Sequence, residues 1–458
     1  MKKFLFFIAS FALAAAMLLG GCSLFSKEGK NGLDGRDGQD GADITVQQLY
    51  EAAKTIAGNE NMTLDEFLRE YLSFDGSDVG VSLMENINKS LMSGVSILTR
   101  FKYTSRYSGT TYKVFTGSGA IISLDKAAGD ALVVTNCHVI YDDTSDTVFC
   151  DDVRLYLYGQ DVRDINYSIS GNYAITNDEK YAINAEVIGA SVTYDIALLK
   201  VSGSAVLKRS DARAAEFSDN ENVYVGQQVY TVGNPEGEGM GTTLGTVSKD
   251  SQSVSLSLSD KNSNDTLTYL VLRTDAAINH GNSGGALYGE DGKIIAIVNA
   301  KDDEADVDNM GYALPAHNVR RLVQRLYYNY LENGNRMQSG GGINKARLNI
   351  TTALTDSYSV YDENNKVAQI YETVKVDSVS GTPSSGLLRA GDVLKKITVC
   401  DTAGSELDSV VITRRYNVSD IMLSVKQGDT VKVTVERNNT ETEVSLLFSL
   451  PSYFAYEK

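Results

Sequence analysis

Between about Leu83 and Pro315, short runs of apolar residues alternate with glycine-rich and polar stretches. Apolar runs of this length, bounded by turn residues, are typical of β-strands. The pattern predicts strands at residues 114–123, 131–135, 154–158, 196–201, 223–232, 253–258, 268–272 and 293–298. The density of these strands favours an all-β body made of two barrels.

Apolar residues recur at helical spacing in three other segments, at 45–57, 63–72 and 317–333. Thr63 and Glu66 form a capping box at the start of the second segment, and Gly334 ends the third. The helix at 63–72 is short and carries an apolar stripe, which needs a surface to pack against. We therefore expect it to pack against the β body or against sister subunits.

A length of 458 residues is too great for one hydrophobic core and predicts two or three domains after a leader. Hydrophobic residues make up 42% of the chain, so most of it is expected to fold. We place the segments at 1–21 (leader), 22–43 (tether), 44–82 (helical), 83–335 (β body), 336–342 (linker) and 343–450 (C-terminal α/β domain).

The leader begins with Lys2 and Lys3 and continues with an apolar run at 4–19, which is short for a spanning helix and predicts an export signal. It ends in a Leu-Gly-Gly-Cys run that resembles the bacterial lipoprotein cleavage box. The resemblance implies that Cys22 becomes a lipidated N-terminus, anchored at the extracytoplasmic face of a bacterial membrane. An ordinary cleaved signal with a chance cysteine is the alternative.

Glycine begins each of five triplets at 29–43, and none of them contains proline. They look like a collagen fragment, but so short a run without proline is hardly stable as a triple helix, which favours a hydrated tether. A surface adhesin is a further hypothesis. The leader contains lysines and no acids, so the mature chain is more acidic than the full chain at −17, and nucleic acid is not an expected partner.

The run from Gly281 to Gly285, Gly-Asn-Ser-Gly-Gly, contains the first candidate for chemistry. Its glycines permit a tight turn in which the amides of Gly281 and Ser283 point at one developing oxyanion. Ser283 is therefore the candidate nucleophile. An ordinary surface turn of the same composition is the alternative.

A serine nucleophile needs a base, and the chain offers three histidines, His138, His280 and His317. His138 follows the apolar strand at 131–135, whose end can hold an imidazole at the edge of a cleft. Asp195 stands before another apolar strand and can orient the imidazole and stabilise its cation. A structural histidine and an acid that merely begins a strand are the alternatives.

The order His138, Asp195, Ser283 is that of chymotrypsin-like proteases. Five runs in sequence resemble the HtrA (DegP-like) family of serine proteases, at 117–122, 135–139, 195–200, 274–287 and 310–316. The resemblance implies a chymotrypsin-like double β-barrel with its cleft between the barrels, and a homotrimer. It also implies a serine endopeptidase that cuts unfolded or damaged envelope proteins. No cofactor is needed, and no metal-ligand spacing appears.

Three features depart from the family pattern. His280 stands where proline is usual, Cys137 precedes the histidine, and 57 residues separate His138 from Asp195, which is long. We assign the surplus to a polar insert at 160–181, which is predicted to be a surface loop or hairpin.

By the same resemblance, residues just before the nucleophile line the pocket for the substrate side chain. Ala277 replaces the acid of a Lys/Arg-cutting enzyme, and Ile278 follows it. An apolar floor leaves a buried cation unpaired, so small or medium aliphatic side chains are expected. A group of acidic residues follows Asn299, at the place where the family has a regulatory loop. A plain solvated loop is the alternative. The residues are Asp302, Asp303, Glu304, Asp306 and Asp308.

Beyond the glycine-rich joint, the chain resembles an HtrA-type PDZ domain at 376–394 and 428–437, with a short helix near 419–425. PDZ modules bind an extended C-terminal peptide as an added strand and capture its carboxylate in a backbone loop. The loop residues are Arg347, Leu348, Asn349 and Ile350. Asn349 stands where glycine is usual, and a purely structural β domain is the alternative.

Three cysteines remain after the leader, Cys137, Cys150 and Cys400. A disulfide between Cys137 and Cys150 and buried free thiols are both consistent with this set. Besides the adhesin hypothesis, two functions stay open: a membrane-anchored extracytoplasmic serine endopeptidase of the HtrA type, and a catalytically latent PDZ-containing scaffold or binding lipoprotein.

Overall fold

The computed structural model describes residues 51, 54–55, 76–107, 109–160, 168–170, 172–174, 180–218, 223–257, 266–301, 310–337 and 341–457. Several predicted features lie outside these residues: the leader, Cys22, the triplets at 29–43, the helix at 63–72, most of the helix at 45–57 and the acidic loop at 302–308. The chain divides into two units, Met1–Gly80 and Val81–Lys458. Within the described part, no helix is both long and apolar enough to cross a membrane.

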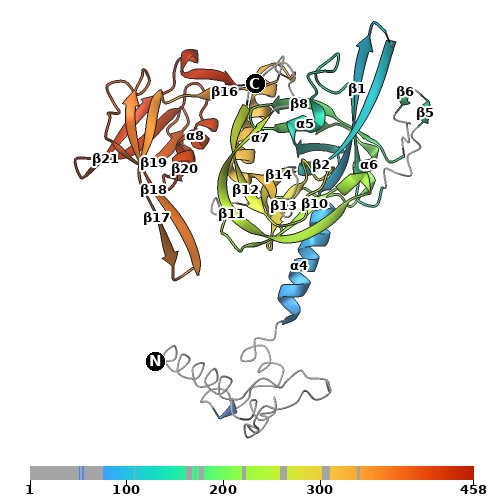
Figure 1. The fold of residues 1–458 in the computed structure, drawn as a ribbon, viewed down its shortest axis with the longest axis horizontal. Coiled ribbons are helices and arrows are strands. Elements are labelled where there is room, and N and C mark those ends of the chain that lie inside the picture. The colour runs from blue at the N-terminus through green and yellow to red at the C-terminus, as the bar shows by residue number, and fades with distance from the viewer. Residues whose placement is uncertain are drawn as a thin grey trace. The chain divides into compact units, whose positions relative to one another are not determined.

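The first half of the β body is a seven-stranded antiparallel sheet (Figure 1). Its strands lie in the order β7 (Ile183–Asn184), β4 (Asp152–Leu157), β1 (Gly94–Ser105), β2 (Gly109–Asp125), β3 (Asp130–Thr135), β9 (Ile196–Val201) and β8 (Glu186–Ser191). Alternate apolar side chains such as Val133, Leu155 and Leu199 form its core. In the insert, β5 (Ser168–Ser170) pairs with β6 (Asn172–Ala174), which confirms the predicted hairpin.

The second half is a closed barrel. Its strands lie in the order β10 (Gln228–Gly233), β11 (Gly241–Ser257), β12 (Thr266–Thr274), β15 (Gly311–Pro315), β14 (Ile294–Lys301) and β13 (Ala286–Gly289). The predicted mainly β body is confirmed, although the first sheet is an open path of strands and only the second closes. Several strands are longer than the apolar runs that predicted them, because polar residues next to those runs also pair with the neighbouring strand.

Helix α4 (Gly76–Leu91) extends past residue 83, where the strand-rich region is expected to begin, and is not among the predicted helices. Leu83, Ile87 and Leu91 recur every four residues and contact the core that the two halves of the β body share. That spacing is a helical signal. The strand region therefore begins later, at Gly94.

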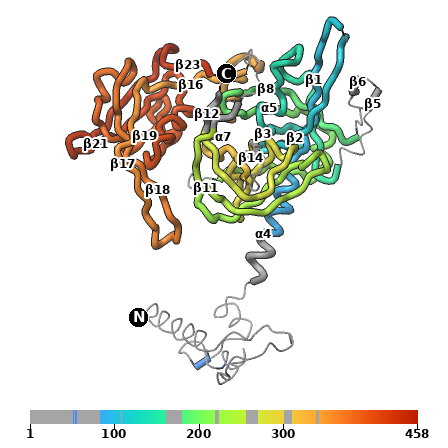
Figure 2. Tube along the Cα trace, viewed as in Figure 1, coloured from blue at the N-terminus to red at the C-terminus, as the bar shows by residue number. Residues whose placement is uncertain are grey.

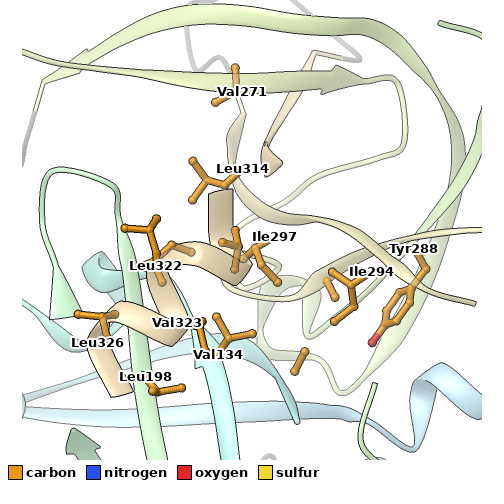
Figure 3. Packing of buried hydrophobic residues seen from close by; sticks show 14 of the residues in the cluster. Val134, Leu198, Val271, Tyr288, Ile294, Ile297, Leu314, Leu322, Val323 and Leu326 are labelled. Atoms are coloured by element: carbon orange, nitrogen blue, oxygen red, sulfur yellow. The ribbon is translucent and has the colours of Figure 1, made fainter. Parts of the chain in front are cut away.

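Helix α7 (Ala316–Glu332) confirms the predicted linker helix and completes the shared core. Leu322, Val323 and Leu326 of this helix belong to the same buried cluster as Val134 of the first sheet and Ile297 of the barrel (Figure 3). A helix with such an apolar stripe ties the two halves together by burying surface from both. The two halves are thereby held on a common core.

The C-terminal domain, at the orange to red end of the trace in Figure 2, has its own sheet and core. Its strands lie in the order β17 (Ile350–Asp362), β18 (Val367–Val379), β19 (Val393–Cys400), β21 (Thr430–Arg437) and β22 (Thr440–Leu447), with β20 (Glu406–Val411) beside β19. A separate pair joins β16 (Ile343–Ala346) to β23 (Phe454–Glu457). β17 is an edge strand, so one of its sides has no strand partner in the described sheet.

Helix α8 (Arg415–Asp420) begins four residues before the predicted helix at 419–425. The Asn417 side chain accepts the backbone N–H of Arg414 at 2.8 Å, which caps the helix at its start. A short 3-10 turn at Ile421–Leu423 follows. The sequence shows the apolar residues of this segment but hides the cap.

Candidate active site

His138 and Asp195 lie at neighbouring strand ends of the first sheet. The short helix α5 (Cys137–Ile140) carries His138 just after β3, and Asp195 precedes β9, which pairs with β3. His138 Nδ1 lies 2.7 Å from Asp195 Oδ2, and the His138 backbone N–H donates to Asp195 Oδ1 at 2.8 Å. This two-point contact fixes the ring and directs Nε2 away from the carboxylate.

The carboxylate also sets the protonation of the imidazole. Desolvation of the ring opposes its charge, but the charge of Asp195 and the hydrogen bond to it prevail and raise the pKa of His138. The His138 side chain is 44% exposed, against 11% for Asp195. Substrate can therefore reach the base, which becomes neutral only at a higher pH than an ordinary histidine.

A third side chain, Asn299, contacts the same carboxylate and is absent from the predicted site. Asn299 lies on β14, is 2% exposed, and donates from Nδ2 to Asp195 Oδ2 at 2.5 Å. The carboxylate is thus held by His138 and Asn299 together. The sequence signal was slight, because an asparagine at the end of an apolar strand is ordinary turn chemistry.

Ser283 is linked to His138 and Asp195 by a hydrogen bond to Asn299. Ser283 Oγ donates to the backbone carbonyl of Asn299 at 3.0 Å. Among the described residues, no hydrogen bond joins Ser283 Oγ to His138. The structure thus gathers the three predicted residues around Asn299, and the hydroxyl must leave that carbonyl before His138 can take its proton.

The loop before Ser283 has the backbone that its glycines permit. Gly281 has a φ of 90°, and a Cβ there would lie 2.2 Å from the carbonyl oxygen of Asn234. The N–H groups of Gly281 and Ser283 donate no hydrogen bond to another described residue. Two unpaired amides beside a nucleophile can stabilise an oxyanion.

Ser118, from β2, connects this loop to the first sheet. Its N–H donates to the Ser283 carbonyl at 2.9 Å, and its hydroxyl donates to the Gly281 carbonyl at 2.6 Å. The same hydroxyl accepts the N–H of Asn234 at 2.8 Å, and Ser118 is fully buried. The serine of the 117–122 run therefore positions the nucleophile loop from the first sheet.

Asn299→Ala is expected to move the acid limb of kcat/KM to higher pH and to lower its plateau about tenfold. Without the amide, less of the Asp195 charge is offset, so the carboxylate holds the proton on His138 more strongly. A pH–rate profile on a denatured protein measures both effects. Asn364→Ala, at an exposed turn, is the control. An acid limb that stays in place in Asn299→Ala would rule out this positioning role.

The two predicted pocket residues differ in burial. Ala277 is exposed, whereas Ile278 is 7% exposed and packs in the barrel core. A Cβ on Gly311 would lie 2.4 Å from Ile278 Cδ1, so glycine there makes room for this side chain. His280 is exposed, and its carbonyl accepts the N–H of Glu236 at 2.6 Å.

The sequence also offers two cysteines and a third histidine as candidate groups. No disulfide joins Cys137 to Cys150, so the bridge considered between them is not formed. Burial, then two neighbouring aspartates, raises the pKa of Cys150 to about 12, which keeps its thiol unreactive at neutral pH. His317 lies 3.7 Å from Asp420 of α8. Among the described residues, no group of His, Cys, Asp and Glu is arranged to hold a metal ion.

The predicted peptide-binding loop, Arg347 to Ile350, links β16 to β17. Asn349 has a φ of 55°, a left-handed backbone that asparagine tolerates, which explains how it replaces the usual glycine. Its Nδ2 donates to the Thr382 carbonyl at 2.5 Å. The N–H groups of Leu348 and Asn349 donate no hydrogen bond to another described residue.

Comparison with known proteins shows what the chain as a whole is similar to. Residues 117–297 match the family described as "Trypsin-like peptidase domain". The chain is similar to "Serine protease Do-like HtrA" of Lactococcus lactis subsp. lactis (strain IL1403), with 29% identity over 73% of this chain and 70% of that protein. It is also similar to "Serine protease Do-like HtrA" of Bacillus subtilis (strain 168), with 28% identity over 71% of this chain and 62% of that protein.

Among solved structures, the chain is similar to "HtrA-type protease AlgW with decapeptide". The identity is 18%, the TM-score is 0.44, and the match covers 82% of this chain and 99% of that one.

Proposed function

We propose that this chain cuts unfolded or damaged envelope proteins with Ser283, His138 and Asp195. It is a serine endopeptidase with a trypsin-like peptidase domain, and HtrA proteases are among its homologues. One observation carries the proposal. His138 Nδ1 lies 2.7 Å from Asp195 Oδ2, and Ser283 is bonded to the same Asn299 that contacts Asp195.

In the proposed reaction, Ser283 Oγ attacks the peptide carbonyl while His138 takes its proton. Asp195 orients the imidazole and stabilises the cation that forms. The amides of Gly281 and Ser283 stabilise the oxyanion. His138 then gives the proton to the leaving amine, and water, deprotonated by His138, releases the acyl group from Ser283.

Specificity for small or medium aliphatic side chains is part of the proposal. Ala277 and Ile278 offer no acid to pair with a lysine or arginine of the substrate. Placing a cation against them without a partner costs several kcal/mol.

We also propose that the C-terminal domain is PDZ-like and captures C-terminal peptides. The unpaired N–H groups of Leu348 and Asn349 support carboxylate binding, and the free edge of β17 supports addition of a peptide strand. Arg347 stands beside the loop; its side chain is 56% exposed and lies 3.9 Å from Glu457.

Anchoring completes the proposal. Cys22, which lies outside the described residues, would carry the lipid, and the segment at 22–43 would hold the enzyme off the membrane as a tether. Assembly into a homotrimer, as the family resemblance implies, would involve the helical N-terminal segment. A homologue from Bartonella henselae is itself named a probable periplasmic endoprotease.

The purified chain is expected to cleave a reduced, denatured protein and to leave the same protein intact when folded. The cuts, located by mass spectrometry, are expected after alanine, valine or leucine, because the pocket lacks an acid. Cuts after lysine or arginine would contradict the pocket assignment. Absence of both cleavage and labelling by a fluorophosphonate probe would favour the scaffold function.

A further inference from the structure

A groove of 1120 Å³ lies beside the predicted peptide-binding loop. It is lined by the loop, the start of β17, α8 and the barrel strands β11 and β12. Leu348, Val418 and Met422 contribute apolar surface to it. Its length along an edge strand and its apolar lining suit an extended peptide.

Cationic side chains outnumber acidic ones in this groove. The cations are Lys249, Lys345, Arg347, Arg414 and Arg415, and the acids are Glu372 and Glu457. The chain as a whole has a net charge of −17. The groove is therefore a positive surface on a negative molecule, which attracts anionic ligands and repels cationic ones.

Two of these cations are available to a ligand. Arg414 is neutralised by Asp250 at 3.0 Å and by Glu372 at 3.7 Å. By contrast, the side chains of Lys249 and Arg415 are exposed and form no ion pair with a described residue. Two unpaired positive charges at the rim of one groove favour a carboxylate in the ligand.

The position of Arg415 fixes where that carboxylate would lie. Arg415 Nε donates to Thr352 Oγ1 at 3.1 Å, so its guanidinium stands beside β17 two residues beyond Ile350. When two strands pair, each residue of one strand lies opposite one residue of the other. A peptide held by its C-terminus at Leu348 and Asn349 would therefore bring its residue two before the end to Thr352 and Arg415.

We infer that this groove selects peptides with an acidic side chain two residues before the carboxyl end. Arg415 is the principal contact and Lys249 adds to the field. The inference rests on the proposed carboxylate capture by the loop and adds the side-chain chemistry of the partner. A lysine at the same place would face like charges.

Binding of short fluorescent peptides to the full chain with Ser283→Ala, which prevents cleavage, tests this inference. The peptides differ only in having glutamate, glutamine or lysine two residues before the end, each with a free or an amidated C-terminus. The glutamate peptide is expected to bind about tenfold more tightly than the lysine peptide at low salt, and less so at high salt. Arg415→Glu is expected to reverse the order. Lys366→Glu, at an exposed turn outside the groove, is the matched charge control.

The outcomes separate the two claims. Equal binding of the glutamate and lysine peptides, with loss on amidation, would overturn the acidic preference and leave carboxylate capture intact. Binding that needs glutamate and Arg415 but tolerates amidation would support the preference and overturn capture of the C-terminus. No binding of any peptide would overturn both.

Discussion

Ser283→Ala is expected to lower kcat/KM on a denatured protein by at least about 10⁴-fold. The substitution removes the atom that attacks the carbonyl, while the amides of Gly281 and Ser283 stay in the loop and leave some oxyanion stabilisation. It also deletes one hydrogen bond, from Ser283 Oγ to the Asn299 carbonyl. The cost to folding is expected to be about 1 kcal/mol or less.

Cleavage rates, fluorophosphonate labelling and a thermal melt measured together check this result. Ser123→Ala, an exposed serine on β2, is the matched control and should keep both rate and labelling. A variant that folds normally and still cleaves would place the nucleophile elsewhere. A variant that has lost its thermal transition would be compared with Ser283→Cys, which keeps a side chain able to bond to Asn299.

Asp195→Asn is expected to reduce kcat/KM about 10⁴-fold at neutral pH. Asp195 accepts hydrogen bonds from the backbone and ring of His138 and from Asn299. An amide in its place offers a donor where the ring nitrogen needs an acceptor. It favours the wrong tautomer of His138 and removes the charge that stabilises the imidazolium.

The pH dependence of this variant gives a second readout. Asp195 raises the pKa of His138, and activity requires the neutral ring, so wild-type activity falls as pH drops through that raised value. Without the carboxylate charge, the acid limb of the residual activity is expected to move to lower pH. Asp211→Asn, on an exposed side chain, is the control. An acid limb that does not move in Asp195→Asn would contradict the claim that Asp195 raises the pKa of His138.

Much of the β body could be predicted from the sequence because its strands are short apolar runs between glycines. The runs at 131–135 and 196–201 correspond closely to β3 and β9. Helix α4 was missed because its apolar stripe, Leu83, Ile87 and Leu91, is narrow and adjoins a strand-rich region. The start of α8 was missed because hydrophobicity does not change there. A hydrogen bond from the Arg414 backbone N–H to the Asn417 side chain marks it instead.

The sequence by itself determined which residues can do the chemistry. Ser283 lies among glycines that a tight turn requires, and only three histidines are present to serve it. The order of the motifs at His138, Asp195 and Ser283 also indicated the class of enzyme. These are local properties, because they depend on residue type and on short-range backbone freedom.

Only the tertiary structure decided how those residues are held. Asn299 contacts Asp195 across 104 residues of sequence, and Ser118 contacts Gly281 across 163. The charges of the groove come from the barrel and the C-terminal domain together. Hydrogen bonds and electric fields depend on distances in space. Those distances are set only when the two halves of the β body pack on their shared core, so they cannot be read from the order of the residues.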